Sequence, residues 1–349
     1  MVAGVNGLDM HVLEAGDAAA PALLLLHGFP ELAWSWRKVM APLAQAGFHV
    51  IAPDQRGYGR TTGWDGDYDG DLPSFRLTNL VKDQKALLQN LGAKSVAAVI
   101  GHDFGSPVAA WCALLHPEIF KSVALMSAPF TGPPASASPP PDSVHAELAV
   151  LARPRKHYQW YYSTREADAD MLQCRQGLHD FLRAYYHVKS ADWKENRPYE
   201  LKAWSAAELA KMPTYYIMDL GENMAQTVAP HMPAQAAAWL TEEELRVYSS
   251  EFGRTGFQAA LQWYRCRTDG KFDAELAKYA GRKIEVPACF IAGKSDWGPH
   301  QRPGSLAKMR DSACARLHSC DFVEGAGHWV QQEQPAEVTR LLLAFLRRS

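Results

Sequence analysis

The sequence predicts an α/β domain whose mostly parallel sheet is flanked by helices and interrupted by a helical insertion. Strand and helix patterns alternate regularly up to about residue 130, as expected for a parallel sheet with helices on both faces. From about 144 to 280 the patterns are mostly helical and rich in aromatic residues, and the alternation resumes after 281. One interrupted sheet domain explains this order better than two serial domains.

The strands and helices of the sheet domain are predicted one by one. The run at 7–16 alternates apolar and polar residues, whereas the run at 21–29 is continuously apolar, as in a buried strand. Further strands are predicted at 49–54, 95–101, 121–129, 283–296 and 317–328. Helical periodicity predicts helices at 36–47, 79–92, 106–118 and 336–348.

The insertion begins with a Pro/Ser-rich stretch at 131–143, which can be neither helix nor central strand and is predicted to be a linker. No pattern of a buried strand is evident between 144 and 280. The predicted division is therefore the first part of the sheet domain at 1–130, linker and helical cap at 131–280, and the second part of the sheet domain at 281–349.

Composition excludes several classes of partner. The balance of 36 basic against 38 acidic residues gives no reason to expect nucleic acid or an anionic membrane. The N-terminus does not resemble a signal peptide, and the longest apolar stretch, 20–28, is too short to span a bilayer. The six cysteines are scattered, so we expect free thiols in a reducing cytoplasm and neither disulfides nor a metal site. They are Cys112, Cys174, Cys266, Cys289, Cys314 and Cys320.

The segment VIGHDFGSPVAAW, 99–111, predicts a nucleophile at a sharp turn between a strand and a helix. Asp103 occupies the centre of the turn, and Gly101 and Gly105 supply the small residues needed two positions before and after it. Pro107 falls in the first helical turn, where its missing N–H costs little. The alternative for this pentapeptide alone is an aspartate that only caps the helix.

A carboxylate nucleophile suits attack on saturated carbon. A serine would form an ether there, which is hard to hydrolyse, whereas an aspartate forms an ester whose carbonyl water can attack. Asp103 therefore points to epoxides or alkyl halides as substrates rather than to esters or peptides.

The second half of such a reaction needs a base and a group that orients it. His328 lies on a Gly-rich loop after a predicted strand, and Asp296 lies just past the preceding strand. The chain order Asp103, Asp296, His328 is the order of nucleophile, acid and histidine that this kind of site requires.

Other titratable residues are weaker candidates. His102 occupies the second position of the turn, where side chains pack into the scaffold. Asp54 is expected to pin its own loop together with Arg56. His300 is a candidate pocket residue, but it lacks a Gly-rich strand end.

An oxyanion hole is predicted from the segment LLHGFPE, 25–31, which follows a buried strand and turns at Pro30. The backbone N–H groups of Phe29 and Phe104 are expected to bind the oxyanion that forms when the ester is hydrolysed.

Five segments together form a specific pattern: HGFPELAWSWR, VIAPDQRGYG, GHDFGS, GKSDWG and GAGHW. In combination they resemble the soluble epoxide hydrolases of the α/β-hydrolase superfamily. The resemblance implies an α/β-hydrolase fold, with a mostly parallel eight-stranded sheet and an inserted helical cap. It also implies hydrolysis of an epoxide to a vicinal diol through an ester on Asp103, without a cofactor or metal.

The resemblance further implies two cap tyrosines that donate hydrogen bonds to the epoxide oxygen. They match Tyr158 in HYQWYY and Tyr264 in LQWYR, although Tyr161 and Tyr162 leave the first assignment open. Phe104 departs from the tryptophan of many relatives, which matters little if only its amide acts.

The expected partners are a small apolar epoxide and water, with no nucleic acid and no membrane; association into a homodimer is left open. The aromatic cap suggests a largely apolar pocket. The expected pocket residues are Phe29, Pro30, Trp160, Trp297 and Trp329.

Two alternatives remain at this stage. A haloalkane or haloacid dehalogenase uses the same Asp-His-Asp residues, but halide release needs side-chain N–H donors, and Phe29 and Phe104 have none. A non-catalytic member of the fold that binds a small molecule is the second alternative, although such proteins commonly lose a catalytic residue.

Overall fold

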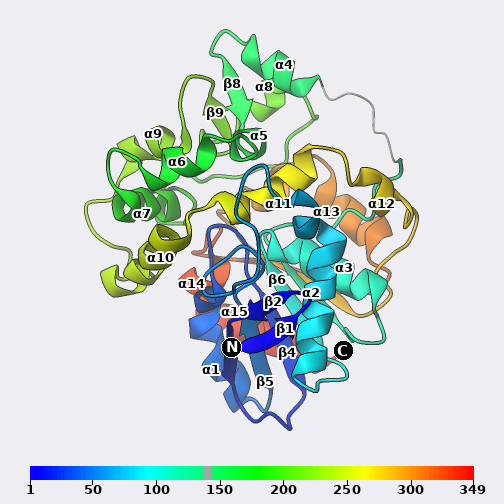
Figure 1. The fold of residues 1–349 in the computed structure, drawn as a ribbon. Helices are drawn as coiled ribbons and strands as arrows, with labels where there is room; N and C mark the ends of the chain where they lie inside the picture. Colours follow the sequence, from blue (N-terminus) through cyan, green and yellow to red (C-terminus); the bar gives the residue numbers. More distant parts are fainter. Residues whose placement is uncertain (137–142) are drawn as a thin grey trace.

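The central element of the computed structural model, which describes residues 1–136 and 143–349, is a seven-stranded sheet (Figure 1). The strand order is β11-β10-β7-β6-β4-β5-β3, and every neighbouring pair is parallel except β3 with β5. The strands are β3 (Val12–Ala15), β4 (Ala22–Leu26), β5 (His49–Pro53), β6 (Ala98–His102), β7 (Val123–Met126), β10 (Ala288–Gly293) and β11 (Leu317–Val323). The predicted fold class, a mostly parallel sheet with flanking helices, is confirmed.

The count of eight strands that the resemblance implied is wrong for the described residues, since the main sheet has seven. The predicted strand at 7–16 is divided at His11. Its first half, β2 (Leu8–Met10), pairs with β1 (Val2–Val5) in a separate two-stranded antiparallel sheet. Its second half, β3, joins the edge of the main sheet. At the break, the N–H of His11 donates to the Thr61 hydroxyl at 3.0 Å.

Helices cover both faces of the sheet, which explains the continuous apolar runs. In β4, Leu23 and Leu25 face one cluster of buried side chains, and Leu24 and Leu26 face the other. The first cluster includes side chains of α1 (Arg37–Gln45) and α15 (Pro335–Leu346), and the second includes side chains of α2 (Leu77–Asn90) and α3 (Gly105–Leu115). A strand buried on both faces has no polar alternation for this reason.

The cap is inserted between β7 and β10 and lies above the sheet in Figure 1, in green and yellow. Its helices are α4 (Val144–Ala149), α5 (Tyr158–Tyr162), α6 (Ala167–Leu172), α7 (Leu178–Val188), α8 (Ala206–Leu209), α9 (Met224–Val228), α10 (Glu242–Thr255), α11 (Gln258–Thr268) and α12 (Asp273–Ala277). The expectation of no strand here is wrong: β8 (Arg155–His157) pairs with β9 (Ile217–Asp219). Each has three residues, too few to show a period in the sequence.

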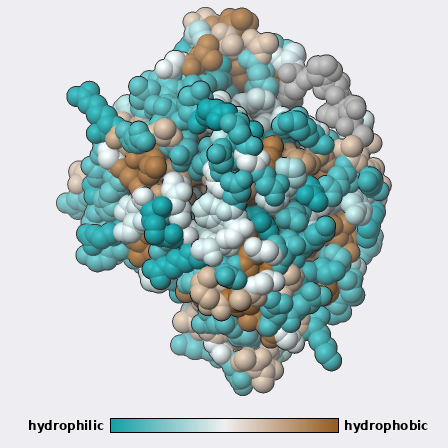
Figure 2. All heavy atoms as spheres, in the orientation of Figure 1, coloured by the Kyte–Doolittle hydropathy of each residue, from teal (hydrophilic) through white to brown (hydrophobic). Residues whose placement is uncertain are grey.

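Part of the predicted linker, 137–142, lies outside the described residues, and the division at 131 and 280 stays a prediction. The surface in Figure 2 is mostly hydrophilic, with separate hydrophobic patches. In the part of the chain that the structure describes, no helix is long and apolar enough to cross a membrane.

The parallel strands β4, β6, β10 and β11 all end at the same edge of the sheet, next to the cap. The loops after these ends carry the residues that the sequence singled out. Ligands bind at this edge in open α/β sheets. Two short helices complete this end of the sheet domain: α13 (Ser305–Lys308) and α14 (Val330–Glu333).

We expect Leu25→Ala to destabilise the protein by about 2–5 kcal/mol, because it leaves a cavity in a fully buried strand. Val150→Ala is the control, since Val150 is 82% exposed, and should change stability by less than about 0.5 kcal/mol. Urea unfolding followed by far-ultraviolet circular dichroism measures both. Equal stability of the two variants would contradict the two-faced burial of β4.

Candidate functional site

Asp103 lies on a strained turn between β6 and α3. Its φ is 51°, in the left-handed region that residues with a side chain rarely adopt. A Cβ on Gly101 would lie 2.1 Å from the carbonyl oxygen of Gly105, and one on Gly105 would lie 2.2 Å from that of Leu26. Both glycines are therefore required for the turn to pack against the sheet.

Each oxygen of the Asp103 carboxylate has one hydrogen-bonding neighbour. Oδ1 accepts the backbone N–H of Phe29 at 3.0 Å, and Oδ2 lies 3.1 Å from Nε2 of His328. The backbone of Gly28 approaches so closely that a Cβ there would lie 2.4 Å from Oδ1. The loop after β4 thus brings an amide to the carboxylate.

His328 and Asp296 complete a hydrogen-bonded line. Nδ1 of His328 lies 3.1 Å from Oδ1 of Asp296, and this oxygen also accepts the N–H of Gly298 at 2.7 Å. Asp296 is 1% exposed and His328 is 2% exposed. The three residues singled out by the sequence therefore lie in one buried row, with the imidazole between two carboxylates.

Both carboxylates are ionised at neutral pH. Burial would raise the pKa of Asp103, but the hydrogen bond and charge of His328 and the charge of Lys189 hold it well below its usual range. Burial also acts to raise the pKa of Asp296, and His328 and the Gly298 amide outweigh it, so that this pKa is lowered. An ionised Asp103 is the form that can act as a nucleophile.

The loop that carries His328 is clamped by groups that the sequence analysis missed. The N–H of His328 donates to the carbonyl of Lys189 in the cap at 2.8 Å. The buried Glu333 carboxylate accepts the N–H groups of Gly327 at 2.9 Å, Trp329 at 3.0 Å and Ala191, also in the cap, at 2.8 Å. Cap and core therefore fix the position of the imidazole together.

A second pair of buried side chains, His102 and Glu31, supports the site. Nδ1 of His102 lies 2.6 Å from the Glu31 carboxylate, and its Nε2 lies 2.7 Å from the carbonyl of His328. Glu31 also accepts the amides of Gly28 at 3.0 Å and Gln331 at 2.9 Å. His102 packs into the scaffold as expected. Glu31 was missed, although it ends the HGFPE segment that drew attention to Phe29.

Tyr158 and Tyr264 face the site from the cap helices α5 and α11. Their ring centroids lie 6.1 Å apart, and the Tyr264 ring packs edge-on against Phe104 at 5.2 Å and Phe29 at 5.6 Å. Burial, followed by the negative charge of Asp103, raises the pKa of both phenols above the usual range. Both hydroxyls are therefore protonated and able to donate.

The hydroxyl of Tyr158 has different hydrogen-bond partners from those of Tyr161 and Tyr162. The hydroxyl of Tyr161 donates to Asp170 at 3.0 Å, and that of Tyr162 donates to Tyr185 at 3.1 Å. The Tyr158 oxygen accepts from Gln159 at 3.1 Å, and the side chain of Gln301 also hydrogen-bonds to this phenol. The Tyr264 hydroxyl has no partner among the described residues, and the same is true of the buried Tyr58 and Tyr216 hydroxyls. The hydroxyls of Tyr161 and Tyr162 are therefore engaged by other side chains, but a free proton does not by itself single out Tyr158 and Tyr264.

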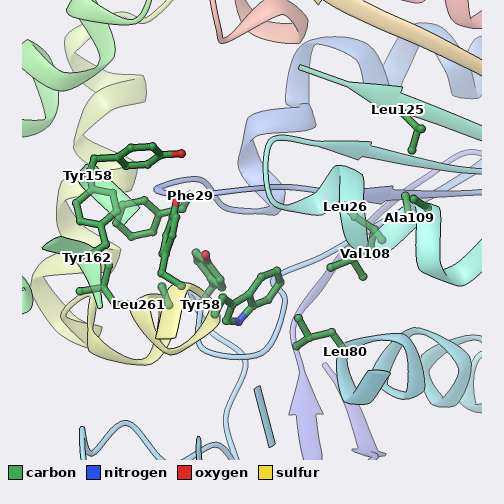
Figure 3. Close-up of a cluster of buried hydrophobic side chains, with 14 of the residues drawn as sticks. Leu26, Phe29, Tyr58, Leu80, Val108, Ala109, Leu125, Tyr158, Tyr162 and Leu261 are labelled. Carbon is green, nitrogen blue, oxygen red and sulfur yellow. The ribbon is translucent and has the colours of Figure 1, made fainter. Parts of the chain in front are cut away.

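Three of the expected pocket residues lie in the core of the site. Figure 3 shows the Phe29 ring beside Tyr162 and Tyr158, and the Phe29 and Tyr162 centroids are 5.1 Å apart. The carbonyl of Pro30 accepts the Tyr186 hydroxyl at 2.7 Å. Trp329 is fully buried and packs against the His328 ring at 4.7 Å, so it supports the imidazole.

The structure does not bring the other two expected pocket residues against Asp103. Trp160 packs on His145, with centroids 3.6 Å apart, and on His157 at 5.3 Å. Trp297 follows Asp296 in the chain, but its ring contacts Tyr199 at 5.1 Å.

The expected pairing of Asp54 with Arg56 is wrong. Arg56 instead makes two hydrogen bonds to Asp83, at 2.7 and 2.8 Å. Asp54 still pins its loop, because it accepts the N–H groups of Ala33 at 2.9 Å and Arg60 at 3.1 Å. Arg56 and Asp83 are far apart in the sequence, so no local pattern revealed their pairing.

Two further groups of residues bear on the predicted chemistry. The half-buried His300 stacks on Phe322, with centroids 6.2 Å apart. The six cysteines are free thiols. In the described part of the chain, no group of His, Cys, Asp and Glu side chains has the arrangement needed to hold a metal ion.

Comparisons with known proteins agree with this geometry. The model of the family described as alpha/beta hydrolase fold matches residues 21–335. Epoxide hydrolase A of Mycobacterium tuberculosis is 34% identical, over 98% of this chain and 95% of that protein. Bifunctional epoxide hydrolase 2 of Sus scrofa is 28% identical, over 97% of this chain and 53% of that protein. The crystal structure of epoxide hydrolase A from Mycobacterium thermoresistibile is 31% identical, with a TM-score of 0.77 over 99% of this chain and 96% of that one.

We expect Gly28→Ala to destabilise the protein by about 1–3 kcal/mol, because the new methyl group would overlap the Asp103 side chain. Gly221→Ala is the control, since a Cβ there meets no atom within 4 Å. Thermal unfolding compares the two variants. Equal midpoints would show that the loop after β4 does not press on Asp103.

Proposed function

The chain belongs to the α/β-hydrolase fold family and, within it, to the epoxide hydrolases, and we propose that it hydrolyses an epoxide to a vicinal diol through an ester on Asp103. One observation carries the proposal: an ionised carboxylate occupies the strained turn, with a histidine 3.1 Å from one oxygen and a backbone amide 3.0 Å from the other.

The first half-reaction is attack on the epoxide. Oδ2 of Asp103 forms a bond to a ring carbon, the carbon–oxygen bond of the ring breaks, and its electron pair passes to the epoxide oxygen. Oδ1 keeps its hydrogen bond from the Phe29 N–H and becomes the carbonyl oxygen of the new ester. Tyr158 and Tyr264 donate to the epoxide oxygen from the cap side, so that the alkoxide is stabilised as it forms.

The second half-reaction is hydrolysis of the ester. His328 takes a proton from water, and the resulting hydroxide attacks the ester carbonyl carbon. Asp296 orients the imidazole and stabilises the imidazolium, as in other acid–histidine pairs. The Phe29 and Phe104 amides bind the oxyanion. When the intermediate collapses, the bond from the carbonyl carbon to the substrate oxygen breaks and the imidazolium gives its proton to that oxygen. The second proton of the water passes from the new carboxyl group to the alkoxide held by the phenols, so that the diol leaves and the carboxylate is restored.

The surroundings of Asp103 favour epoxide over halide substrates. Two indole groups lie close by, but the Trp263 N–H donates to the Arg56 carbonyl at 3.0 Å and the Trp329 N–H donates to the Tyr186 carbonyl at 2.8 Å. The available donors above the carboxylate are phenols, which suit an alkoxide. A purely binding role is disfavoured because nucleophile, base and acid are all present.

The substrate proposed is a small apolar epoxide, with water as the second reactant. It is supported by the aromatic rings beside the site: Tyr264 packs against Phe29, whose amide binds the carboxylate, and against Phe104, which follows Asp103 in the chain. A cytoplasmic location belongs to the same proposal and rests on the free thiols.

We expect His328→Gln to form the ester but not to hydrolyse it, because glutamine cannot take a proton from water. Incubated with styrene oxide, this variant should gain the mass of one substrate molecule on the peptide that contains Asp103. Mass spectrometry of a digest locates the adduct, and an adduct on another peptide would contradict the assignment of the nucleophile.

The matching control uses the wild-type protein with styrene oxide and, separately, with 1-bromobutane. Diol from the first without bromide from the second is the expected result. Bromide without diol would identify a dehalogenase, and neither product from several substrates would favour a binding protein.

We expect the double variant Tyr158→Phe/Tyr264→Phe to lose diol formation by about 1000-fold or more, because no phenol then stabilises the alkoxide. Each single variant should lose less. Tyr161→Phe is the control, since its hydroxyl bonds to Asp170. Diol formation at the wild-type rate by the double variant would show that other groups supply the proton.

A further inference from the structure

The hydroxyl of Tyr158 is held by side-chain amides, which have no role in the two half-reactions. Nε2 of Gln159, the next residue of α5, donates to the Tyr158 oxygen at 3.1 Å. The side chain of Gln301 hydrogen-bonds to the same phenol. Gln301 belongs to the loop after β10 that also carries Asp296, so one amide comes from the cap and the other from the sheet domain.

The ring of Tyr158 is fixed by its aromatic neighbours. His157 stacks on it, with centroids 5.2 Å apart and an angle of 21° between the planes, and Tyr216 packs edge-on at 5.1 Å. Tyr158 is 4% exposed. Because the ring cannot turn freely, the direction of the O–H bond is the freedom that remains to this group.

The amides restrict that direction. A phenol both donates and accepts hydrogen bonds, and an N–H that points at the oxygen excludes the O–H proton from the same position. The contact with Gln301, like that with Gln159, acts to lower the pKa of Tyr158, as expected of an amide that donates to the phenol oxygen. The proton is therefore turned away from both amides and is left for a bound acceptor.

The second phenol, Tyr264, lacks this support. Burial, followed by the charge of Asp103, raises the pKa of both phenols, but in Tyr158 the hydrogen bonds of Gln159 and Gln301 oppose the increase, whereas no hydrogen bond does so in Tyr264. A hydroxyl that accepts a hydrogen bond is also a stronger donor, because linked hydrogen bonds polarise one another. The two phenols are thus unequal donors.

We propose that Gln159 is a positioning residue for ring opening: its amide, together with that of Gln301, turns the Tyr158 proton toward the epoxide oxygen and makes Tyr158 the principal donor to the alkoxide. The inference rests on the proposed function, because it concerns the first half-reaction. It gives Gln159 no role in hydrolysis of the ester, where His328 takes a proton from water.

The side chain of Gln159 can be changed without loss of its backbone hydrogen bonds. Its N–H donates to Nδ1 of His157 at 3.2 Å, and its carbonyl accepts the Ser163 hydroxyl at 2.8 Å. Gln159→Met keeps the length of the side chain and removes the amide. Gln159→Glu keeps the shape, but an ionised carboxylate accepts and cannot donate. Gln176→Met is the matched control, since it removes a half-buried amide that donates to the Ala225 carbonyl within the cap at 2.8 Å.

The experiment measures ring opening alone, in the His328→Gln background, where the ester accumulates. Samples with styrene oxide are quenched at intervals, and mass spectrometry of the intact protein follows the alkylated fraction. We expect Gln159→Met to slow alkylation about 10-fold, because one hydrogen bond to the donor is lost. Gln159→Glu should slow it about 100-fold, because the carboxylate accepts the Tyr158 proton itself. Gln176→Met should leave the rate unchanged.

A second set of backgrounds tests whether Gln159 acts through Tyr158. Combined with Tyr158→Phe, Gln159→Met should have no further effect on alkylation, because the oxygen that the amide binds is gone. Combined with Tyr264→Phe, its effect should persist in full. Equal slowing in both backgrounds would reduce Gln159 to a structural role and overturn the proposal. Tyr158→Phe alone should slow alkylation more than Tyr264→Phe, and the reverse order would also overturn it.

Hydrolysis of the ester is the internal control. In single-turnover experiments with His328 intact, Gln159→Met should hydrolyse the ester at the wild-type rate, and a decay slowed as much as alkylation would contradict the proposal. If the wild type forms no diol and His328→Gln forms no adduct, the proposed function fails and this inference fails with it. Alkylation by Gln159→Met at the rate of its parent overturns the inference alone.

Folding of the variants is checked by circular dichroism. If Gln159→Met does not fold, Gln159→Leu replaces it in each measurement. Gln301→Met is expected to slow alkylation in the same way, again with no effect when Tyr158→Phe is present. If no variant that lacks either amide folds, the amides are a requirement of the fold rather than of the phenol, and the proposal is wrong.

Discussion

The left-handed backbone at Asp103 is the constraint on which the rest of the site depends. This conformation turns the carboxylate out of the sheet at the end of β6, and it is possible only because Gly101 and Gly105 allow backbone atoms to approach closely. Gly28 extends the same constraint to the loop after β4, whose Phe29 amide then reaches Oδ1. The strain is local, and the packed sheet around it keeps the turn in place.

The base depends on the cap as much as on the sheet domain. The N–H of His328 donates to the carbonyl of Lys189, and Glu333 accepts N–H groups from both Gly327 in this loop and Ala191. Lys189 and Ala191 both belong to the cap. The phenols above Asp103 also come from the cap. A movement of the cap would therefore displace the base and the proton donors together, which couples opening of the site to loss of its geometry.

The sequence predicted strands and helices best where burial produces a recognisable pattern of apolar residues. Residues 21–29 predicted a buried strand because both faces of β4 are covered, and the helix at 36–47 showed the spacing of one covered face. The division of 7–16 into β2 and β3 was not visible, since the hydrogen bond of His11 at the break goes to the distant Thr61. The three-residue strands β8 and β9 were too short to show any period.

The sequence by itself determined the candidates whose chemistry is local: a carboxylate between two glycines at 101–105, a histidine on a Gly-rich loop, and an acid after the preceding strand. Tertiary structure alone decided that Asp103, His328 and Asp296 form one line, and that the hydroxyls of Tyr161 and Tyr162 donate to Asp170 and Tyr185. It alone brought Glu31, Lys189 and Glu333 to the site, and it paired Arg56 with Asp83. The physical reason is that these hydrogen bonds and charges act between residues distant in the chain. Turn geometry and the burial of one element, in contrast, depend on residues that are close together in the sequence.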